Sequence, residues 1–330
     1  MGAARLFWLQ SGGCGGCTMS WLCQEDPDLS DTLAAAGIEL LWHPALSEAS
    51  GEQTLAMLEQ AATEGVDILC VEGAIPRGPG GSGRFHRFAG ATMLDWIERL
   101  APKARHVVAV GSCAAFGGIT SGGGNPSDAA GLQYLVEEAG GILGGDFRSR
   151  AGLPVVNVAG CPTHPEWVSQ TLALLAAGNL TLDDLDPLNR PRFYADVLAH
   201  HGCPRNEYYE YKASAEFAGQ LGCLMEHLGC VGTQAHADCN VRGWNGGNSC
   251  IDAGTPCIHC TAPGFEAPGH PFMQTPKIAG IPVGLPTDMP KAWFVALASL
   301  AKSATPARLR NNARKDRVVT PPSVKSTRRR

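Results

Sequence analysis

Cysteine is the residue type in this sequence with the clearest chemical potential. The chain contains 13 cysteines among its 330 residues, an odd number that cannot pair completely in disulfides. Its first residues show no secretory or twin-arginine signal, so we expect a cytoplasmic protein with reduced thiols. In that setting, grouped cysteines indicate metal binding rather than a disulfide framework.

Four of the cysteines follow segments that look like buried strands. They are Cys14 and Cys17, which form a CxxC pair in a glycine-rich turn, and Cys113 and Cys161. If the strands are neighbours, the four thiols meet at the carboxyl edge of a sheet, where ligands bind in open α/β folds. Four converging thiolates suit either an iron–sulfur cubane or a structural zinc ion.

A carboxylate follows another of these strand-like segments. Glu72 comes directly after the apolar run Ile68–Val71 and should face the same edge of the sheet. One interpretation is a carboxylate that tunes the potential of a nearby cluster or moves protons beside it. The other interpretation is an ordinary capping or loop hydrogen bond.

The second half of the chain is richer still in cysteine. Residues 203–260 contain seven cysteines, a density typical of small domains that are not organised by an apolar core. Two four-ligand sites are possible there: Cys239, Cys250, Cys257 and Cys260 for one, and His200, Cys203, Cys223 and Cys230 for the other. Zinc would tolerate both sets, but three groups of soft ligands in one chain favour electron transfer. Cys23 and Cys70 fall outside these groups, and we expect both to be buried core thiols.

Alternating strand-like and helix-like segments must position these ligands. The apolar runs are Leu6–Leu9, Leu40–Trp42, Ile68–Val71, Val107–Val110 and Val155–Val158, and helix-like segments include Glu52–Ala62, Met93–Leu100, Trp167–Ala177 and Lys291–Ser303. This alternation predicts an α/β fold with a doubly wound, mostly parallel sheet. We expect residues 1–182 to form that domain and residues 183–300 to form an irregular, cysteine-rich domain, with a linker at 183–194.

The end of the chain differs in composition from the rest. Residues 301–330 contain ten Lys and Arg and a single acidic residue, Asp316, although the whole chain carries a net charge of −5. This composition predicts a flexible basic tail. The overall negative charge does not favour nucleic-acid binding. We expect no membrane span, because no apolar stretch approaches the roughly 18 residues that one needs.

In order and approximate spacing, these motifs resemble the small subunit of nickel–iron hydrogenases over nearly the whole chain. They are the CxxC turn at 14–17, VEGAIP at 71–76, GSCAAFGG at 111–118, NVAGCP at 157–162, HxxC at 200–203, and NC…WN…C…PCIHC at 239–260. The resemblance implies a flavodoxin-like amino-terminal domain and three iron–sulfur clusters. The implied ligands are Cys14, Cys17, Cys113 and Cys161 for a proximal cluster, Cys239, Cys257 and Cys260 for a medial one, and His200, Cys203, Cys223 and Cys230 for a distal one.

Two positions refine what the resemblance implies. Cys250 stands where many family members have proline, so it supplies the medial site with a fourth thiolate. Gly16 lies in the middle of the CxxC turn, which therefore lacks the extra cysteine of the oxygen-tolerant membrane-bound class. We expect three 4Fe-4S clusters in this chain and a nickel–iron centre in a separate large subunit.

The segments 206–216 and 225–240 resemble the cytosolic regulatory hydrogenases, which report hydrogen to a histidine kinase. The resemblance implies a hydrogenase that is active only with its large subunit, as a heterodimer or a dimer of heterodimers. Electrons would pass from the nickel–iron site through the proximal, medial and distal clusters, and the basic tail could bind the sensor kinase. Two other functions stay open: a cytosolic uptake hydrogenase, and a zinc-stapled protein without redox chemistry.

Overall fold

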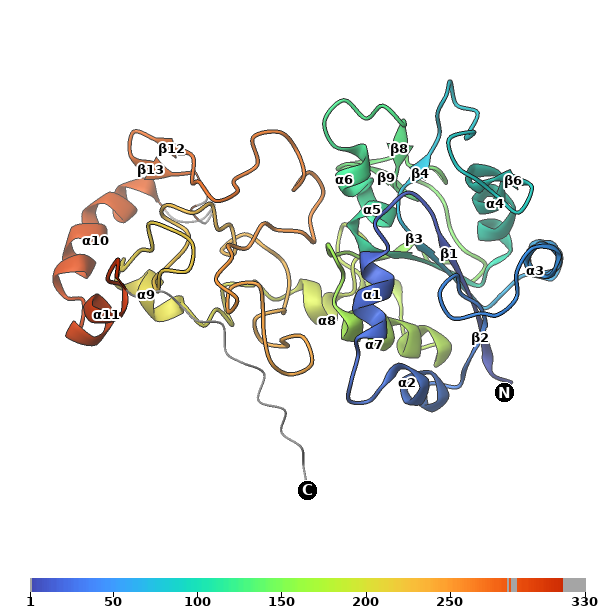
Figure 1. The fold of residues 1–330 in the computed structure, drawn as a ribbon, viewed down its shortest axis with the longest axis horizontal. Coiled ribbons are helices and arrows are strands. Elements are labelled where there is room, and N and C mark those ends of the chain that lie inside the picture. Colours follow the sequence, from blue (N-terminus) through green and yellow to red (C-terminus); the bar gives the residue numbers. More distant parts are fainter. Residues whose placement is uncertain (1, 284, 286–289, 317–330) are drawn as a thin grey trace. The chain divides into compact units, whose positions relative to one another are not determined.

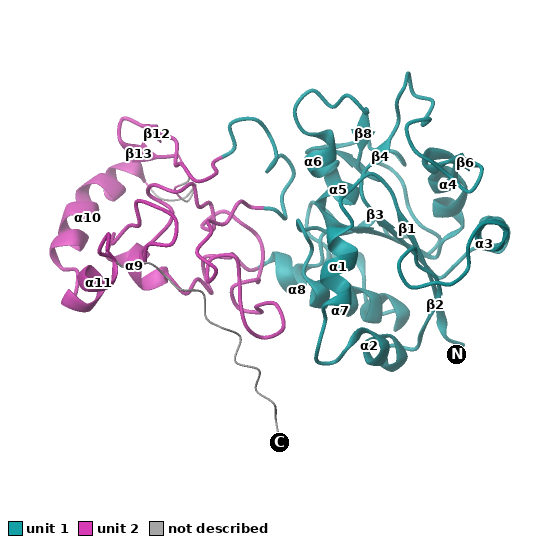
Figure 2. Cartoon of the chain, in the orientation of Figure 1, with its two compact units in different colours: residues 1–196, 260–270 teal, residues 197–259, 271–330 magenta. Residues whose placement is uncertain are grey.

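The chain divides into two compact units. The computed structural model describes residues 2–283, 285 and 290–316. Unit 1 contains residues 1–196 together with 260–270, and unit 2 contains 197–259 and 271–330 (Figure 2). The boundary therefore lies later in the chain than the predicted one after residue 182, and the segment 260–270 returns to the first unit.

Unit 1 is built on a five-stranded parallel sheet. Its strands are β1 (Ala4–Gln10), β2 (Ile38–Trp42), β3 (Ile68–Glu72), β7 (His106–Val110) and β11 (Val156–Val158). Their order across the sheet is β2-β1-β3-β7-β11, which is the flavodoxin order (Figure 1). Every residue of β3 and β7 is buried, as expected for strands that are covered on both faces. The predicted α/β, flavodoxin-like fold is confirmed.

Helices pack on the two faces of this sheet. They are α1 (Gly16–Leu22), α2 (Leu29–Ala35), α3 (Glu52–Glu64), α4 (Met93–Leu100), α5 (Gly111–Phe116), α6 (Gly118–Ser121), α7 (Pro165–Ala176) and α8 (Arg192–Ala195). Successive side chains of β1 point to opposite faces. Phe7 belongs to the core that includes Leu58 of α3 and Trp96 of α4, whereas Trp8 stacks on Trp21 of α1 with 4.8 Å between ring centroids.

Short elements fill the connections of unit 1. Pairs of two-residue strands are β4 (Ile75–Pro76) with β8 (Ala129–Ala130), β5 (Arg87–Phe88) with β6 (Ala91–Thr92), and β9 (Tyr134–Leu135) with β10 (Glu138–Ala139). Single 3-10 turns, η1 (Ala101–Lys103) and η2 (Leu182–Asp184), follow α4 and α7. The helix α4 begins with a capping box in which Thr92 and Asp95 bond each other's backbone amides.

The segment 183–194 is not the linker that its polar composition predicts. Asp186 and Arg190 form a buried ion pair with 2.6 Å between their charged atoms, and Arg190 also donates to the carbonyl of Thr261. Tyr194 is fully buried, stacks on Trp167, and donates its hydroxyl to a carbonyl of β11. Because its charges satisfy each other, this polar segment packs against the edge of the sheet.

Unit 2 is irregular and rich in cysteine, as predicted. Its described elements are α9 (Asn206–Glu210), β12 (Lys277–Ile278), β13 (Ile281–Pro282), α10 (Lys291–Ser303) and α11 (Ala307–Asn312). A small apolar core unites them and consists of Tyr208, Tyr209, Cys223, Met225, Leu285, Phe294 and Leu309. One of the candidate ligands, Cys223, is thus part of the core itself.

The prediction of a flexible basic tail is wrong for its first half. Residues 301–316 complete α10 and form α11, whose Leu309 is fully buried. Arg308 pairs with Glu207, and the Lys315 ammonium lies 2.6 Å from the Glu216 carboxylate. The composition of the tail could not reveal these acidic partners, because they lie about 100 residues earlier in the chain. Residues 317–330 lie outside the described residues.

Candidate metal centres

Four cysteines meet at the carboxyl edge of the sheet in unit 1. Cys14 and Cys17 lie in the turn after β1 and the first turn of α1, Cys113 lies in α5 after β7, and Cys161 follows β11. Cys113 and Cys161 are within electrostatic range of each other and of both thiols of the CxxC pair. The structure therefore brings together the four residues that the strand argument predicted to converge.

Glycines make room for the sulfur atoms of this edge. A Cβ on Gly111 would overlap the Cys17 sulfur, and a Cβ on Gly118 would lie 3.0 Å from the Cys113 sulfur. The Gly16 amide donates to the Cys14 sulfur at 3.3 Å, an interaction that favours a thiolate. This glycine cradle and its all-sulfur donor set fit a metal–sulfur group.

Burial changes the acidity of these thiols. It raises the pKa of Cys17, and the nearby charges of Glu72, Cys113 and Cys161 raise it further. Burial likewise raises the pKa of Cys161, to about 12. Because only the thiolate binds metal, loading this site must release protons, and the bound cations must stabilise the thiolates.

The carboxylate of Glu72 sits beside the CxxC turn. It is only 3% exposed, and it accepts the backbone N–H groups of Cys17 and Thr18, each at 3.1 Å, as well as the Thr18 hydroxyl. These amides belong to the first turn of α1, where helical N–H groups lack partners within the helix. Glu72 therefore anchors the helix that carries Cys17, and it places a buried negative charge next to that thiol.

Behind Glu72 lies an aromatic and histidine cluster. The Thr18 hydroxyl is 3.4 Å from Nε2 of His43, and the His43 ring packs against Trp8 and Trp21. His43 is fully buried, and burial lowers its pKa to about 4. The ring is thus neutral near pH 7, and it supports the base of α1 without adding a charge near the cysteines.

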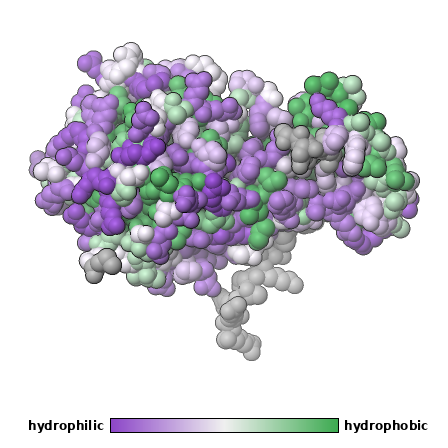
Figure 3. Space-filling model, turned by 180° about the vertical axis from the view of Figure 1, so that it is seen from behind, coloured by the Kyte–Doolittle hydropathy of each residue, from purple (hydrophilic) through white to green (hydrophobic). Residues whose placement is uncertain are grey.

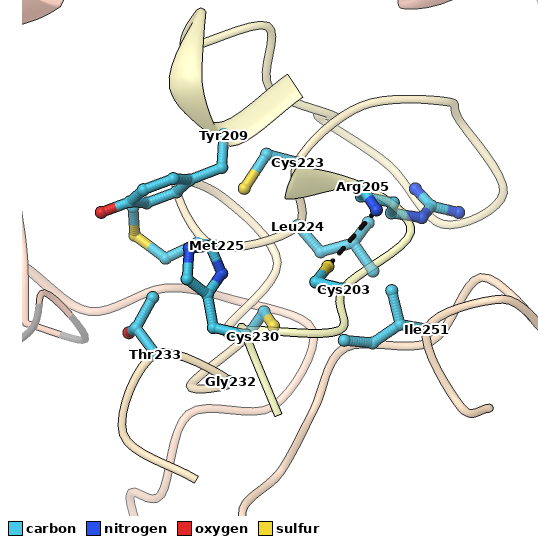
Figure 4. A pocket seen from close by; sticks show the side chains of 11 residues that line it. Cys203, Arg205, Tyr209, Cys223, Leu224, Met225, Cys230, Gly232, Thr233 and Ile251 are labelled. Atoms are coloured by element: carbon cyan, nitrogen blue, oxygen red, sulfur yellow. Dashed lines mark hydrogen bonds between the residues drawn. The ribbon is translucent and has the colours of Figure 1, made fainter. Parts of the chain in front are cut away.

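A second group of candidate ligands lines one cavity in unit 2. The cavity is small and partly open to solvent. His200, Cys203, Cys223 and Cys230 all line it. The side chains of Cys203, Cys223 and Cys230 come from different sides of the cavity (Figure 4), and the apolar Leu224, Met225 and Ile251 also line it. The structure thus brings the predicted distal set together.

His200 is held in this cavity by ring and backbone contacts. The His200 ring packs edge-on against Tyr209 with 4.5 Å between ring centroids, and the backbone N–H of His200 donates to the carbonyl of Gly232. Burial lowers the pKa of His200, which favours the neutral imidazole that binds metals. Burial raises the pKa of Cys203 to about 11 and that of Cys223 to about 12.

Arg205 is a lining residue that sequence reasoning missed. Its side chain is buried, its backbone N–H donates to the Cys203 sulfur at 3.4 Å, and its guanidinium donates to the carbonyls of Gln220 and Gly222 (Figure 4). Arg205 therefore ties the turn that holds Cys203 to the loop that leads into Cys223. The sequence feature that could have indicated this role is the position of Arg205, two residues after the cysteine of the HxxC motif.

The residues predicted for a medial site are divided between the units. Cys239, Cys250 and Cys257 belong to unit 2, and Cys260 belongs to unit 1. Within unit 2, the Cys257 carbonyl accepts the N–H of Val231, and a Cβ on Gly232 would lie 3.5 Å from Cys257 Cβ and 3.6 Å from Cys230 Sγ. Within unit 1, the Cys260 carbonyl accepts the Ser112 hydroxyl.

Three further observations concern metals, spare cysteines and membranes. Among the described residues, no group of three His, Cys, Asp or Glu side chains is placed to hold a single metal ion. Cys70 is buried in β3 as predicted, whereas Cys23 is exposed at the end of α1, so the prediction of a core thiol there is wrong. No helix in the described ranges is long and apolar enough to cross a membrane.

Comparison with known proteins identifies two family matches. The family described as NADH ubiquinone oxidoreductase, 20 Kd subunit, matches residues 14–175, and the C-terminal family of NiFe/NiFeSe hydrogenase small subunits matches residues 194–273. The F420 non-reducing hydrogenase II small subunit of Methanosarcina mazei is 35% identical over 326 residues, covering 90% of this chain and 82% of the relative. The periplasmic [NiFeSe] hydrogenase small subunit of Desulfomicrobium baculatum is 34% identical and covers 82% and 86%.

Solved structures agree with these matches. The actinobacterial-type NiFe-hydrogenase from Ralstonia eutropha H16 aligns with a TM-score of 0.73 at 30% identity, covering 98% of this chain and 95% of that one. The reduced Ni-Fe-Se hydrogenase from Desulfomicrobium baculatum aligns with a TM-score of 0.68 at 32% identity, covering 82% and 99%. The chain therefore belongs to the small subunits of nickel–iron hydrogenases, the electron-transfer subunits that carry iron–sulfur clusters and work with a large subunit holding the nickel–iron site.

Proposed function

We propose that this chain holds three 4Fe-4S clusters and connects the nickel–iron site of its large subunit to an electron acceptor. The observation that carries the proposal is the convergence of Cys14, Cys17, Cys113 and Cys161 at one edge of the sheet. The glycines around their sulfurs support a bound group in which all four thiolates take part. When bound, such clusters supply one-electron transfer.

At the proximal site, Glu72 orients one of the proposed ligands and adds negative charge beside it. Glu72 fixes the first turn of α1 through two amides and the Thr18 hydroxyl, which holds Cys17 in place. Its buried carboxylate also adds negative charge near that thiol. Because net charge is one of the factors that set cluster potentials, Glu72 should lower the potential at this site.

At the distal site, the proposed ligands are His200, Cys203, Cys223 and Cys230, which line one cavity. An imidazole in place of one thiolate makes the ligand set less negative, which raises the potential. The Arg205 guanidinium, within electrostatic range of Cys203, Cys223 and Cys230, adds positive charge. For the medial site we propose Cys239, Cys250, Cys257 and Cys260. Its fourth thiolate comes from Cys250.

Iron and sulfide analysis of the purified complex with the large subunit tests the number of clusters. We expect about twelve iron atoms in this chain, four for each cubane. A value near eight would reject the three-cluster assignment. Replacing Cys250 with Pro should leave three medial thiolates and produce a 3Fe-4S centre, visible as a new EPR signal in the oxidised state. An unchanged spectrum would remove Cys250 from the ligand set.

We further propose that the complex is a cytoplasmic hydrogen sensor that signals to a histidine kinase. The proposal rests on the resemblance of segments 206–216 and 225–240 to regulatory hydrogenases. Both segments supply walls of the distal cavity: Tyr209 comes from the first, and Cys230 and Gly232 from the second. The features that resemble the sensor class therefore gather at the distal cavity, where we place the last cluster.

A second candidate is an uptake hydrogenase that supplies electrons to metabolism. The names of the matched relatives, an F420 non-reducing and a periplasmic hydrogenase, favour this role. Purification of the complex from its host with its bound partners separates the two candidates. A co-purified kinase and very low hydrogen turnover would support the sensor, whereas high turnover with a physiological acceptor would support uptake. A colourless chain that contains zinc would contradict both.

A further inference from the structure

The side chain of Ser112 is buried among the proposed metal ligands of unit 1. Hydrophilic side chains occupy much of the molecular surface, as the face in Figure 3 shows, and water can satisfy them there. Ser112 is instead only 1% exposed, at the point where β7 passes into α5. A buried hydroxyl needs hydrogen-bond partners within the protein. The partners of Ser112 therefore show which parts of the chain it joins.

The Ser112 hydroxyl joins two segments that each carry a proposed ligand. It accepts the backbone N–H of Gly160 at 3.0 Å, and it donates to the carbonyl of Cys260. The Ser112 N–H also donates to the Gly160 carbonyl at 3.0 Å, so Ser112 and Gly160 are bonded twice. Both residues in this double contact directly precede a proximal cysteine, Cys113 and Cys161 respectively. One side chain thus connects the loops of two proximal cysteines to a cysteine that we assign to the medial site.

The backbone of Cys260 is held in unit 1 by two buried donors. Cys260 begins the segment 260–270, which belongs to unit 1. Its own carbonyl is bonded by Ser112, and the next carbonyl, that of Thr261, accepts the buried Arg190 guanidinium at 2.9 Å. The thiols of Cys260 and Cys161 lie within electrostatic range of each other. Ser112 and Arg190 therefore hold a proposed medial ligand near a proximal thiol.

Another buried serine of unit 1 shows how a purely local hydroxyl behaves. The Ser149 hydroxyl donates to the carbonyl of Leu153, four residues later in the chain. The Ser112 hydroxyl donates to a carbonyl 148 residues later, and it makes no cap bond to its own helix α5. A bond of this range does not stabilise the turn in which Ser112 lies. It determines instead where the distant segment that begins with Cys260 is placed.

We propose that Ser112 is a positioning residue, which fixes the medial ligand Cys260 beside the proximal cluster and thereby sets the spacing across which electrons pass between the two clusters. The inference rests on the cluster assignments of the proposed function. Electron transfer slows steeply as the distance between donor and acceptor grows, and the magnetic coupling between two reduced clusters weakens with the same distance. The hydroxyl acts through the backbone of Cys260 and is not itself a ligand.

Ser112→Ala, studied in the complex with the large subunit, tests this positioning. The variant removes the hydroxyl without adding atoms, and every proposed ligand remains. We expect about twelve iron atoms in this chain, as in the natural protein, but a smaller magnetic splitting between the reduced proximal and medial clusters in the EPR spectrum. Ser112→Thr keeps a hydroxyl and should restore the splitting. Ser149→Ala, which removes the local bond to Leu153, is the matched control and should keep the natural splitting.

The outcomes separate this inference from the proposed function. A Ser112→Ala protein with the natural splitting would overturn the inference, as would an equal change in Ser112→Thr or in Ser149→Ala. Loss of the medial cluster with the proximal cluster retained would support it, because Cys260 is then no longer held in place, whereas loss of the proximal cluster alone would overturn it. A natural complex with twelve iron atoms but no splitting would also overturn it. A natural complex with about eight iron atoms would reject the three-cluster function itself, before any variant is compared.

Discussion

Gly111 approaches Cys17 so closely that a Cβ at residue 111 would overlap the cysteine sulfur. Gly111 begins α5 after β7, and Cys17 lies in α1 after β1, so this contact joins the ends of two strands that are not neighbours. Gly111 also has a φ of +84°, which side chains other than glycine rarely adopt. Glycine is thus required at this position for two reasons: the positive φ of its backbone, and the space that the Cys17 sulfur occupies.

Gly111→Ala should therefore remove the proximal cluster, because the new methyl group displaces Cys17 from the other three thiols. We expect the iron content of the chain to fall by about four atoms, with the remaining clusters still visible by EPR. The control is Gly90→Ala. Gly90 has the same φ of +84°, but a Cβ there would meet no atom within 4 Å. If both variants keep all their iron, the proximal assignment fails.

Replacement of Arg205 should shift the potential of the distal cluster alone. Arg205→Met removes a buried positive charge and the guanidinium bonds to the carbonyls of Gln220 and Gly222, whereas the backbone N–H that donates to the Cys203 sulfur remains. We expect a lower reduction potential in an EPR-monitored titration, because the reduced, more negative cluster loses a stabilising charge. Arg205→Lys should shift it less. Arg310→Met, at an exposed cation of the same unit, should leave the titration unchanged; an equal shift there would attribute the effect to overall charge.

The sequence could predict what depends on local pattern. The five strands of the sheet appear as apolar runs, and the cysteines that follow three of them mark the edge of the sheet where ligands gather. It could not predict what depends on partners distant in the chain. The Asp186–Arg190 pair lies at the sheet edge, where Arg190 also donates to the Thr261 carbonyl, and Arg308 pairs with Glu207. Composition assigned both segments to flexible regions for that reason.

Arg205 and Cys23 show the same limit at the level of single residues. Arg205 follows the HxxC motif, but only the folded loop reveals that its guanidinium reaches the carbonyls of Gln220 and Gly222. Cys23 has the apolar character of a core residue, yet α1 ends there and leaves it exposed. In both cases the tertiary surroundings, not the residue type, decide the role.

His106 should make the stability of unit 1 depend on pH. It starts β7 at the edge of the sheet opposite the cysteines, it is buried, and neither ring nitrogen has a hydrogen-bond partner within the described residues. Burial lowers its pKa to about 4; the charge of Arg105 lowers it further, and that of Asp67 opposes the shift. In the unfolded chain the His106 imidazole binds a proton below about pH 6.5, but in the folded chain it does so only near pH 4.

The contribution of His106 to the free energy of unfolding is therefore complete above about pH 6.5. It declines as the pH falls toward 4, by up to roughly 3 kcal/mol. The thermal midpoint of the natural protein should drop between about pH 7 and pH 5. His106→Leu, which removes this titrating group at similar volume, should make the dependence less steep, and the part that comes from the buried His43 should remain. A variant with an equally steep loss would assign the pH effect to other groups.

Leu309→Ala should destabilise the distal site, although Leu309 is not one of the proposed ligands. Leu309 is fully buried in the core that contains Tyr209 and Cys223, so its truncation should destabilise unit 2 by about 2–5 kcal/mol. On incubation with an iron chelator, the distal cluster should be lost faster than the proximal one. Leu300→Ala, at an exposed position of α10, is the control and should change neither rate. Equal loss of both clusters in Leu309→Ala would show that the two units do not unfold separately.

Deletion of residues 317–330 separates a role in partner binding from a role in folding. This segment contains five Lys and Arg and no acidic residue, and it follows α11, so its removal leaves Leu309 and every proposed ligand in place. We expect unchanged iron content and hydrogen turnover. If the kinase recognises the basic segment, the deletion should abolish the complex. The binding of the full chain should then weaken as salt rises, because exposed charges are screened within about 10 Å at 0.1 M.

Deletion of 304–330 is the informative contrast, because it also removes α11 and should cost the distal cluster. A protein without residues 317–330 that still binds the kinase, with the salt dependence of the full chain, would place the docking surface elsewhere.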